Sequence, residues 1–446
     1  MRWNDSASLV LAGALMGVAS VLAFTPTPVL TRAAEAAVAS VSQELNLFGD
    51  VFERVRADYV EKPDDAALIQ SAINGMVSGL DAESSYLSPK DLKAVGTTAG
   101  STSGDLGLVL TVESGAIKVV SAIDDTPAAK AGILANDFIT AIDGVDLPGV
   151  TLGQAIDQMR GAVGAPITLT VVRSGVDKPY DVKLQRAETT VQSVRSREDG
   201  QVGYIRISQF TSQTDAELRA AIGKIQSDLG MDKVQGYVID LRSNPGGVFD
   251  QAVAVADDFL DGGAVVSMRG RDPAKARRID SHPGDLAPGK PIVLLVNGGS
   301  ASEAEIVAGA LQDDRRATIL GTRSFGRGSM QSIIPLGANG ALRLTTARYY
   351  TPSGRSIQAK GIDPDIIVAE DLPPGVVKTS SAPTGQTTPQ GSGSNVATNA
   401  KVETGSPGYV SPDPQDDKQL VYALNLLRGV LVNATFPSDP SQGVPN

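Results

Sequence analysis

The chain of 446 residues has no cysteine, one histidine and one tryptophan. The lack of cysteine excludes a thiol nucleophile, disulfide bonds and cysteine-ligated metals, although it does not identify the compartment. The only histidine, His282, lies in the turn-rich segment 280–285, where we expect an exposed side chain. A Ser-His-Asp hydrolase would depend on this one residue, and a zinc site built from several histidines is excluded.

Positive charge is also scarce. Lysine and arginine total 39, against 50 aspartate and glutamate residues, which gives a formal net charge of −11. Because there is no basic block, no nucleic-acid partner is expected. Hydrophobic residues make up 41% of the chain and charged residues 20%, which is typical of a soluble globular protein of two or three domains at this length.

The N-terminus has the pattern of an export signal. Arg2 precedes an apolar segment at 9–24, and Ala34-Glu35-Ala36 offers a cleavage sequence. We therefore predict a signal peptide over 1–36 and a location in the periplasm or cell envelope. The segment is short for a membrane span, which needs about 20 residues. An uncleaved anchor that associates with the membrane stays open as an alternative, as does a buried core helix.

The next two regions differ in their periodicity. Residues 37–100 carry apolar stripes at helical spacing, in 42–61 and 65–80, and predict an N-terminal helical region. Residues 101–190 contain short alternating strands instead. The strands are expected at 106–112, 117–121 and 167–173, with a helix at 151–160.

Strands and helices alternate over residues 191–371, which predicts an α/β sheet. The expected strands are 203–207, 235–240, 292–296, 317–320 and a longer run at 341–350, and the expected helices are 214–229, 249–260 and 303–312.

The C-terminal part changes character again. Residues 372–415 are rich in Ser, Thr, Gly, Pro and Gln and predict a disordered linker. Residues 416–446 contain a last helix at 419–432, whose leucines we expect to dock on the body of the protein.

One stretch of the α/β region carries the chemistry. The strand 292–296 runs into a polar turn, and a helix begins at Glu303. A serine at a strand-to-helix turn, here Ser302, is where an α/β scaffold exposes a nucleophile, because the free N–H groups and dipole of the helix favour a developing oxyanion. The alternative is a plain helix cap, since Ser300–Glu303 and Ser302–Glu305 both have the capping-box pattern.

Over roughly residues 40–370 the chain resembles the C-terminal processing (tail-specific) serine proteases. The matching motifs, in chain order, are T-P-A-x-x-A-G-I and D-x-I-x-x-I-D-G of a PDZ domain, D-L-R-x-N-P-G-G, G-S-A-S, F-G-x-G with Gln331, and T-A-R-Y-Y-T-P-S-G-R-S. Any one motif is weak, but the ordered set is specific. The resemblance implies an α/β fold class: an N-terminal helical cap, an inserted PDZ domain over 101–190, and a crotonase-like ββα protease core over 191–371.

The resemblance also assigns roles to residues. Ser302 takes the nucleophile position, and the general-base position follows 25 residues later (327 − 302 = 25). Gln331 would hydrogen-bond the side chain at position 327. The expected oxyanion donors are the backbone N–H groups of Glu303 and of a glycine, Gly246 or Gly247. In the PDZ domain, the backbone at Leu106, Gly107 and Leu108 would bind the terminal carboxylate of a peptide that adds as a strand.

Two residues depart from the family pattern. The family has alanine after the nucleophile and lysine as general base, whereas this chain has Glu303 and Arg327. A buried lysine can become neutral near pH 7, but arginine, with a pKa above ~12, cannot accept the serine proton. The sequence leaves three alternatives open: Glu303 pairs with Arg327, Glu303 accepts the proton itself, or Lys360 substitutes as base.

The resemblance implies a serine endopeptidase that cleaves proteins or peptides captured by free, apolar C-terminal tails, with no metal or organic cofactor. Because Arg327 replaces the lysine, a catalytically impaired pseudoprotease that only binds peptides or proteins is the alternative. A purely structural PDZ scaffold is a third interpretation. The sequence does not decide the physiological substrate or the oligomeric state, and a homo-oligomer stays open.

Overall fold

The computed structural model describes residues 27–81, 83–92, 104–113, 115–147, 150, 152–188, 192–369, 408–411 and 413–437. The apolar segment 9–24 and most of the predicted linker lie outside the described residues. The chain divides into two compact units, Met1–Ile73 and Asn74–Asn446.

The first unit is helical, as the periodicity predicts. It contains α2 (Thr27–Asp58) and the start of α3 (Asp65–Ser78). Helix α2 begins well before the predicted start at residue 42, and the predicted cleavage point after Ala36 falls inside it. Among the described helices, none combines the length and the apolar character that a membrane span requires.

In the second unit, a sheet in the order β2-β3-β4-β6-β7 forms the predicted PDZ region. Its strands are β2 (Leu108–Glu113), β3 (Ala116–Ala122), β4 (Phe138–Ile142), β6 (Pro166–Val172) and β7 (Tyr180–Gln185), with β5 (Val145–Asp146) beside β4. Helices α5 (Pro127–Lys130) and α6 (Leu152–Met159) accompany them. Among the described strands, β2 lies at the edge of this sheet, so one side of its backbone is paired with none of them and could receive a further strand.

The protease region is built on a six-stranded sheet in the order β17-β14-β13-β10-β9-β8. Its strands are β8 (Val194–Asp199), β9 (Val202–Ile207), β10 (Gly236–Asp240), β13 (Ile292–Val296), β14 (Thr318–Gly321) and β17 (Ile366–Ile367). All neighbouring pairs are parallel except β8 with β9. The predicted α/β sheet is therefore confirmed.

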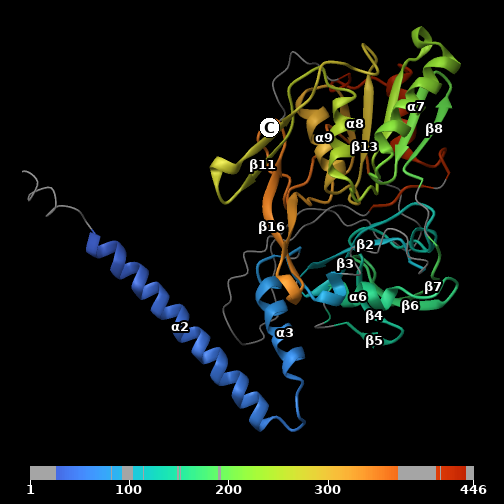
Figure 1. Ribbon diagram of the computed structural model, residues 1–446. Helices are drawn as coiled ribbons and strands as arrows, with labels where there is room; N and C mark the ends of the chain where they lie inside the picture. The colour runs from blue at the N-terminus through green and yellow to red at the C-terminus, as the bar shows by residue number, and fades with distance from the viewer. Residues whose placement is uncertain are drawn as a thin grey trace, which may run out of the picture. The chain divides into compact units, whose positions relative to one another are not determined.

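Alternate side chains of the central strands point into two different hydrophobic cores, one on each face of the sheet, because successive side chains of a strand point to opposite faces. Ile239 and Leu294 face the core shared with α7 (Thr214–Leu229), α8 (Phe249–Asp257) and α9 (Glu303–Asp313). Val238 and Val293 face the core shared with α10 (Lys418–Leu427). Figure 1 shows α7, α8 and α9 beside this sheet. The predicted docking of the C-terminal helix is confirmed, although it ends at Leu427 rather than residue 432.

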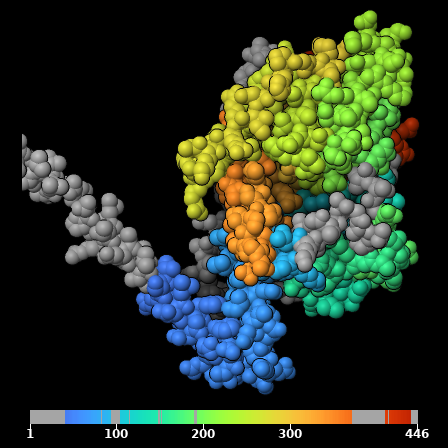
Figure 2. Space-filling view, viewed as in Figure 1, coloured from blue at the N-terminus to red at the C-terminus, as the bar shows by residue number. Residues whose placement is uncertain are grey.

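A second, antiparallel sheet follows the order β1-β16-β11-β12, with β15 also paired to β16. Its strands are β1 (Ser85–Leu87), β11 (Ala264–Gly270), β12 (Arg277–Asp280), β15 (Ser329–Pro335) and β16 (Ala341–Tyr350). The long orange hairpin β15–β16 is prominent in Figure 2, and β16 pairs with β1 of the light-blue segment. This pairing brings residues 83–87 to the protease region. Short 3-10 turns lie at Met231–Lys233, Pro273–Lys275 and Gly337–Asn339.

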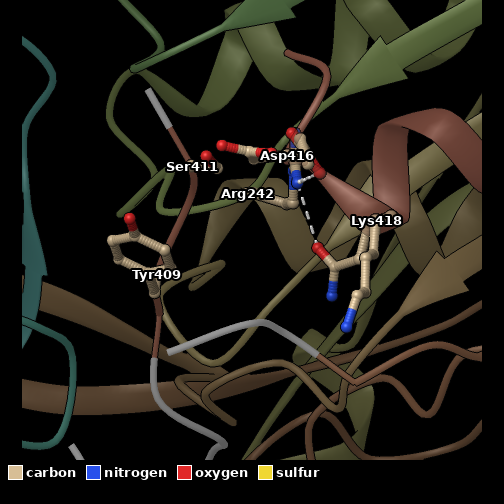
Figure 3. A pocket seen from close by; sticks show the side chains of 7 residues that line it. Arg242, Tyr409, Ser411, Asp416 and Lys418 are labelled. Carbon is tan, nitrogen blue, oxygen red and sulfur yellow. Dashed lines mark hydrogen bonds and ion pairs between the residues drawn. The ribbon is translucent and has the colours of Figure 1, made fainter. Parts of the chain in front are cut away.

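A buried arginine anchors α10. Arg242, 1% exposed, donates to Asp240 at the end of β10 and to both carboxylate oxygens of Asp417, at 2.8 and 2.7 Å. Asp417 also caps α10 by accepting from the Leu420 N–H. Figure 3 shows Arg242 between the segment that carries Tyr409 and the start of α10. The cavity beside it, about 10 Å³, has room for at most one water, so this cluster is an anchor rather than a ligand site.

Candidate active site

Three loops meet at one edge of the protease sheet. They follow β10, β13 and β14, and span residues 241–247, 297–302 and 322–328. Because these strands are parallel neighbours, their carboxyl ends open on the same side, which is where ligand sites form in such sheets. The topology therefore brings the predicted nucleophile, oxyanion loop and base position together.

Ser302 occupies a strained turn. Its backbone has φ +56° and ψ −114°, a conformation that residues other than glycine rarely adopt. Helix α9 begins at the next residue. Such strain is found where a reactive side chain has to be held out of a regular element. Gly246 makes room for the turn, since a Cβ there would lie 2.9 Å from the Cβ of Ser302.

A residue that we did not single out from the sequence as functional, Glu305, ties this turn to the base loop. Its Oε2 accepts the N–H groups of Ser302 and Arg327, at 2.9 and 2.8 Å. Its Oε1 accepts the Gly326 N–H and the Ser324 hydroxyl. Burial raises the pKa of Glu305 to about 7, against the lowering effect of these four donors. The capping-box pattern of Ser302–Glu305 was the available signal, but it gave no sign of the contacts to 324–327.

The two predicted oxyanion glycines differ in where their N–H groups go. Gly246 N donates to Asn244 Oδ1 at 2.9 Å, within its own loop. Gly247 N points toward the nucleophile turn and donates to Glu303 Oε2 at 2.8 Å. The Glu303 backbone N–H is the first of α9 and has no acceptor within the helix. Of the two glycines, Gly247 therefore directs its N–H toward the nucleophile turn and Gly246 supplies space, and the oxyanion role of Gly247 and Glu303 stays a prediction.

Arg327 is held by an ion pair with Glu83. Glu83 comes from the segment before β1, its side chain is 5% exposed, and its other oxygen accepts the Thr111 hydroxyl of β2 at 2.9 Å. Arg343 lies near this ion pair. Burial lowers the pKa of Arg343, the charge of Glu83 opposes this shift, and the charge of Arg327 adds to it. The cation at the base position thus has a buried carboxylate partner that the sequence did not reveal.

Gln331 lies on β15, where its amide nitrogen donates to Thr345 Oγ1 at 2.8 Å and to Ser329 Oγ at 3.1 Å. Its Oε1 is buried and has no hydrogen-bond partner among the described residues. An acceptor left in this state is costly, and a donor from position 327 would satisfy it. The predicted hydrogen bond between Gln331 and residue 327 is absent in this structure, because Arg327 has only donors and the Gln331 acceptor has no partner.

These residues line one cavity of about 950 Å³. Ser302, Glu303, Arg327, Gln331 and Gly247 contribute to it, and its other lining residues are Pro245, Phe249, Asp250, Met268, Ala276, Arg277, Arg278, Ile279, Ser329, Met330 and Tyr349. The rings of Phe249 and Tyr349 stack with centroids 5.6 Å apart and form an apolar wall. The cavity is large enough for several residues of an extended peptide.

Two other candidates lie away from this cavity. The Lys360 side chain is exposed and does not line it, although its backbone lies beside Gly326. His282 is 86% exposed and its Nδ1 lies 3.1 Å from Asp257, which confirms the predicted solvated histidine. Neither residue is placed to take a proton from Ser302.

The PDZ region contacts the same loops. Ser121 of β3 donates to the Ser243 carbonyl at 2.6 Å, at the start of the oxyanion loop. Val120 packs with Ala301 and Phe325, which flank the nucleophile and base positions. Strand β3, the neighbour of the edge strand β2, thus contacts both sides of the candidate site.

The predicted carboxylate site of the PDZ region is already hydrogen-bonded. The N–H groups of Leu106 and Gly107 both donate to Asp105 Oδ1, the latter at 3.0 Å. Leu108 begins the edge strand β2. Gly107, at φ +73°, cannot be replaced, because a Cβ would lie 2.2 Å from Thr126. A peptide carboxylate would have to displace Asp105 to reach these donors.

Comparison with known proteins agrees with this geometry. Residues 201–368 match peptidase family S41, and residues 118–173 match the PDZ domain. The chain is 53% identical over 400 residues to the "Carboxy-terminal-processing protease" of Bartonella bacilliformis, covering 90% of this chain and 92% of that one. This chain belongs to the carboxy-terminal-processing proteases of peptidase family S41.

Two further relatives support the assignment. A "Probable CtpA-like serine protease" of Staphylococcus aureus is 35% identical over 73% of this chain and 64% of its own length. The solved structure of a photosystem II D1 C-terminal processing protease superposes with a TM-score of 0.63 at 27% identity, covering 72% of this chain and 92% of that one. The predicted family, fold class and enzyme class, a serine-type endopeptidase of the C-terminal processing class, are therefore confirmed.

Proposed function

We propose that this S41 protein cleaves unfolded or flexible protein tails, with Ser302 as nucleophile. The observation that carries the proposal is the placement of Ser302 on a strained turn at the N-terminus of α9, in a cavity that also receives the Gly247 N–H. Attack of Ser302 Oγ on a peptide carbonyl would form an ester and release the amine, with the carbonyl oxygen turned toward the donors of Gly247 and Glu303.

The proton of Ser302 is the difficulty in this mechanism. The guanidinium of Arg327 stays charged, and its pairing with Glu83 makes it a still poorer proton acceptor. A fixed cation near the turn favours the serine alkoxide, but it takes no proton from it. We therefore expect the wild-type protein to hydrolyse slowly compared with a lysine-containing relative.

The second candidate function follows from the same observation. A protein with an intact cavity and PDZ region, but with Arg327 locked to Glu83, would bind peptides without cleaving them. Hydrolysis of an unfolded protein by the wild type, Ser302→Ala and Arg327→Lys separates the two. Slow cleavage that Ser302→Ala abolishes supports the protease. Peptide binding without Ser302-dependent cleavage supports the binding protein.

Apolar tails are the substrate class that the cavity favours. Its wall includes Phe249, Met268, Ile279, Met330 and Tyr349, which would bury an apolar side chain next to the scissile bond. The open edge of β2 supports strand addition of the tail in the PDZ region, with Asp105 as a competitor for its carboxylate. Cleavage-site mapping on a denatured protein would test this preference, and cuts with no bias toward apolar residues would refute it.

Export to the cell envelope is supported by the N-terminal charge, the apolar segment 9–24 and the sequence Ala34-Glu35-Ala36. Mass spectrometry of the protein from envelope fractions of its host tests this directly. A mature chain that begins after Ala36 is the expected result. A chain that keeps Met1 in the soluble cytoplasm would contradict export.

A further inference from the structure

The Glu303 side chain lies where a substrate oxygen belongs. It is 8% exposed, lines the active-site cavity, and its Oε2 accepts the Gly247 N–H at 2.8 Å. Effective oxyanion donors lie about 2.7–3.1 Å from the oxygen that they stabilise. The carboxylate oxygen is therefore at the distance from Gly247 that the oxygen of a tetrahedral intermediate would have.

The position of this oxygen relative to the nucleophile supports the same assignment. A Cβ built on Gly246 would lie 2.2 Å from Glu303 Oε2, 2.9 Å from the Ser302 Cβ and 3.2 Å from the Glu303 backbone nitrogen. Three atoms thus converge on one point: the carboxylate oxygen, the carbon that carries the nucleophile, and the second expected oxyanion donor. Gly246, at φ +101°, is what leaves this point open.

The surroundings of this point stabilise negative charge. The N-terminus of α9 begins at Glu303, and its free N–H groups and dipole stabilise negative charge. Tyr349 in the cavity wall also senses this side chain: burial raises the pKa of Tyr349, and the electrostatic interaction with Glu303 raises it further. A carboxylate oxygen on an oxyanion donor resembles the oxyanion in charge and in geometry.

We propose that Glu303 occupies the oxyanion site of this protein and holds it in a self-inhibited state, which a substrate carbonyl has to displace before Ser302 can react. The inference rests on the proposed protease function and adds its regulation. It also explains why the residue after the nucleophile matters: alanine, which the family has at this position, leaves the site empty. Arg327 and Glu303 then suppress hydrolysis through independent steps, proton removal and oxyanion binding.

Activity measurements in an Arg327→Lys background test the inhibition. We expect Glu303→Ala to raise kcat/KM up to ~10²–10³-fold, the effect of one oxyanion donor, and Glu303→Gln to raise it less, because its neutral oxygen still competes for Gly247. Glu198→Ala, on the exposed surface of β8, is the matched control and should change nothing. An active Arg327→Lys protein that Glu303→Ala does not accelerate overturns the proposal.

A second readout does not depend on catalysis. In ¹⁵N-labelled full-length protein, the Gly247 amide proton should shift upfield in Glu303→Ala and keep its position in Glu198→Ala, because only the former loses the carboxylate acceptor. An unchanged Gly247 resonance in Glu303→Ala overturns the occupancy. If no variant shows Ser302-dependent hydrolysis, the protease function fails, and this measurement still decides where the Glu303 carboxylate lies.

Discussion

Replacing Arg327 by lysine restores a proton acceptor only if the lysine can lose its charge, and Glu83 opposes this. The Glu83 carboxylate is buried and paired with residue 327, so it would favour the ammonium form of a lysine there. We therefore predict a small gain for Arg327→Lys alone and a much larger one when Glu83→Gln accompanies it. The glutamine keeps an acceptor for Thr111, which donates to Glu83 at 2.9 Å.

The magnitudes follow from the fraction of neutral lysine. A lysine whose pKa stays at ~10.4 is neutral in about 1 of 250 molecules at pH 8. General-base help is worth ~10²–10⁴-fold when the base is fully available. Multiplied by that fraction, the single variant gains at most ~40-fold. Removing the Glu83 charge lets burial lower the lysine pKa, and the gain then approaches the full ~10²–10⁴-fold.

The assay is the initial rate of cleavage of a fluorescently labelled, unfolded protein at pH 8, with Ser302→Ala in each background as control. Glu83→Gln alone should not raise the rate, because Arg327 remains the residue at the base position. Equal rates for Arg327→Lys with and without Glu83→Gln would refute the argument from Glu83. A wild type that already cleaves fast in a Ser302-dependent way would refute the argument from Arg327 itself.

Three further predictions concern residues outside the nucleophile and the base. The folded pKa of Glu305, about 7, lies above its ordinary 4.5, so the folded chain holds this proton more tightly than the unfolded chain does. The free energy of unfolding should therefore fall by up to about 3 kcal/mol as the pH rises from about 4.5 to 7. Urea titrations that show no dependence on pH, or a dependence that Glu305→Gln does not flatten, would contradict this. In the full-length Ser302→Ala protein, Asp105→Ala should strengthen the binding of a peptide with a free C-terminus about 2–10-fold, the worth of one exchanged hydrogen bond. Calorimetry should show no change in the affinity for the amidated peptide, and equal effects on both peptides would exclude carboxylate capture. Arg242→Ala should lower the free energy of unfolding by about 3–5 kcal/mol, because it leaves Asp240 and Asp417 buried without their partner. A loss below about 1 kcal/mol in chemical denaturation would show that α10 docks without Arg242.

Local patterns in the sequence were sufficient for the elements that position the nucleophile. The apolar run at 292–296 became β13 with the same bounds, and the helix expected at 303–312 became α9. Both are signalled by contiguous residues, an apolar strand followed by a polar turn and a helical segment. The placement of Ser302 at their junction needed no long-range information.

The partners of the site residues were not predictable in this way, because they come from distant parts of the chain. Glu83 and Arg327 are 244 positions apart, and they meet because β1 pairs with β16. The three-residue strand β1 carries too little pattern to be recognised. The role of Glu305 in joining the nucleophile and base loops likewise depends on how 324–327 folds back over α9. From the sequence, Glu303 was a candidate partner for Arg327; the structure pairs Arg327 with Glu83 and sets Glu303 on Gly247.

Covalent labelling of Ser302 tests the central claim most directly, namely that the cavity is a serine-protease site suppressed by Arg327 and Glu303. The measurement is the rate at which a fluorophosphonate adds to Ser302, followed by intact-mass and peptide mass spectrometry in the wild type and in the triple variant Glu83→Gln, Glu303→Ala, Arg327→Lys. We predict one adduct per chain at Ser302, formed far faster in the triple variant than in the wild type. Failure of the triple variant to label at Ser302, or labelling no faster than in the wild type, would contradict the account.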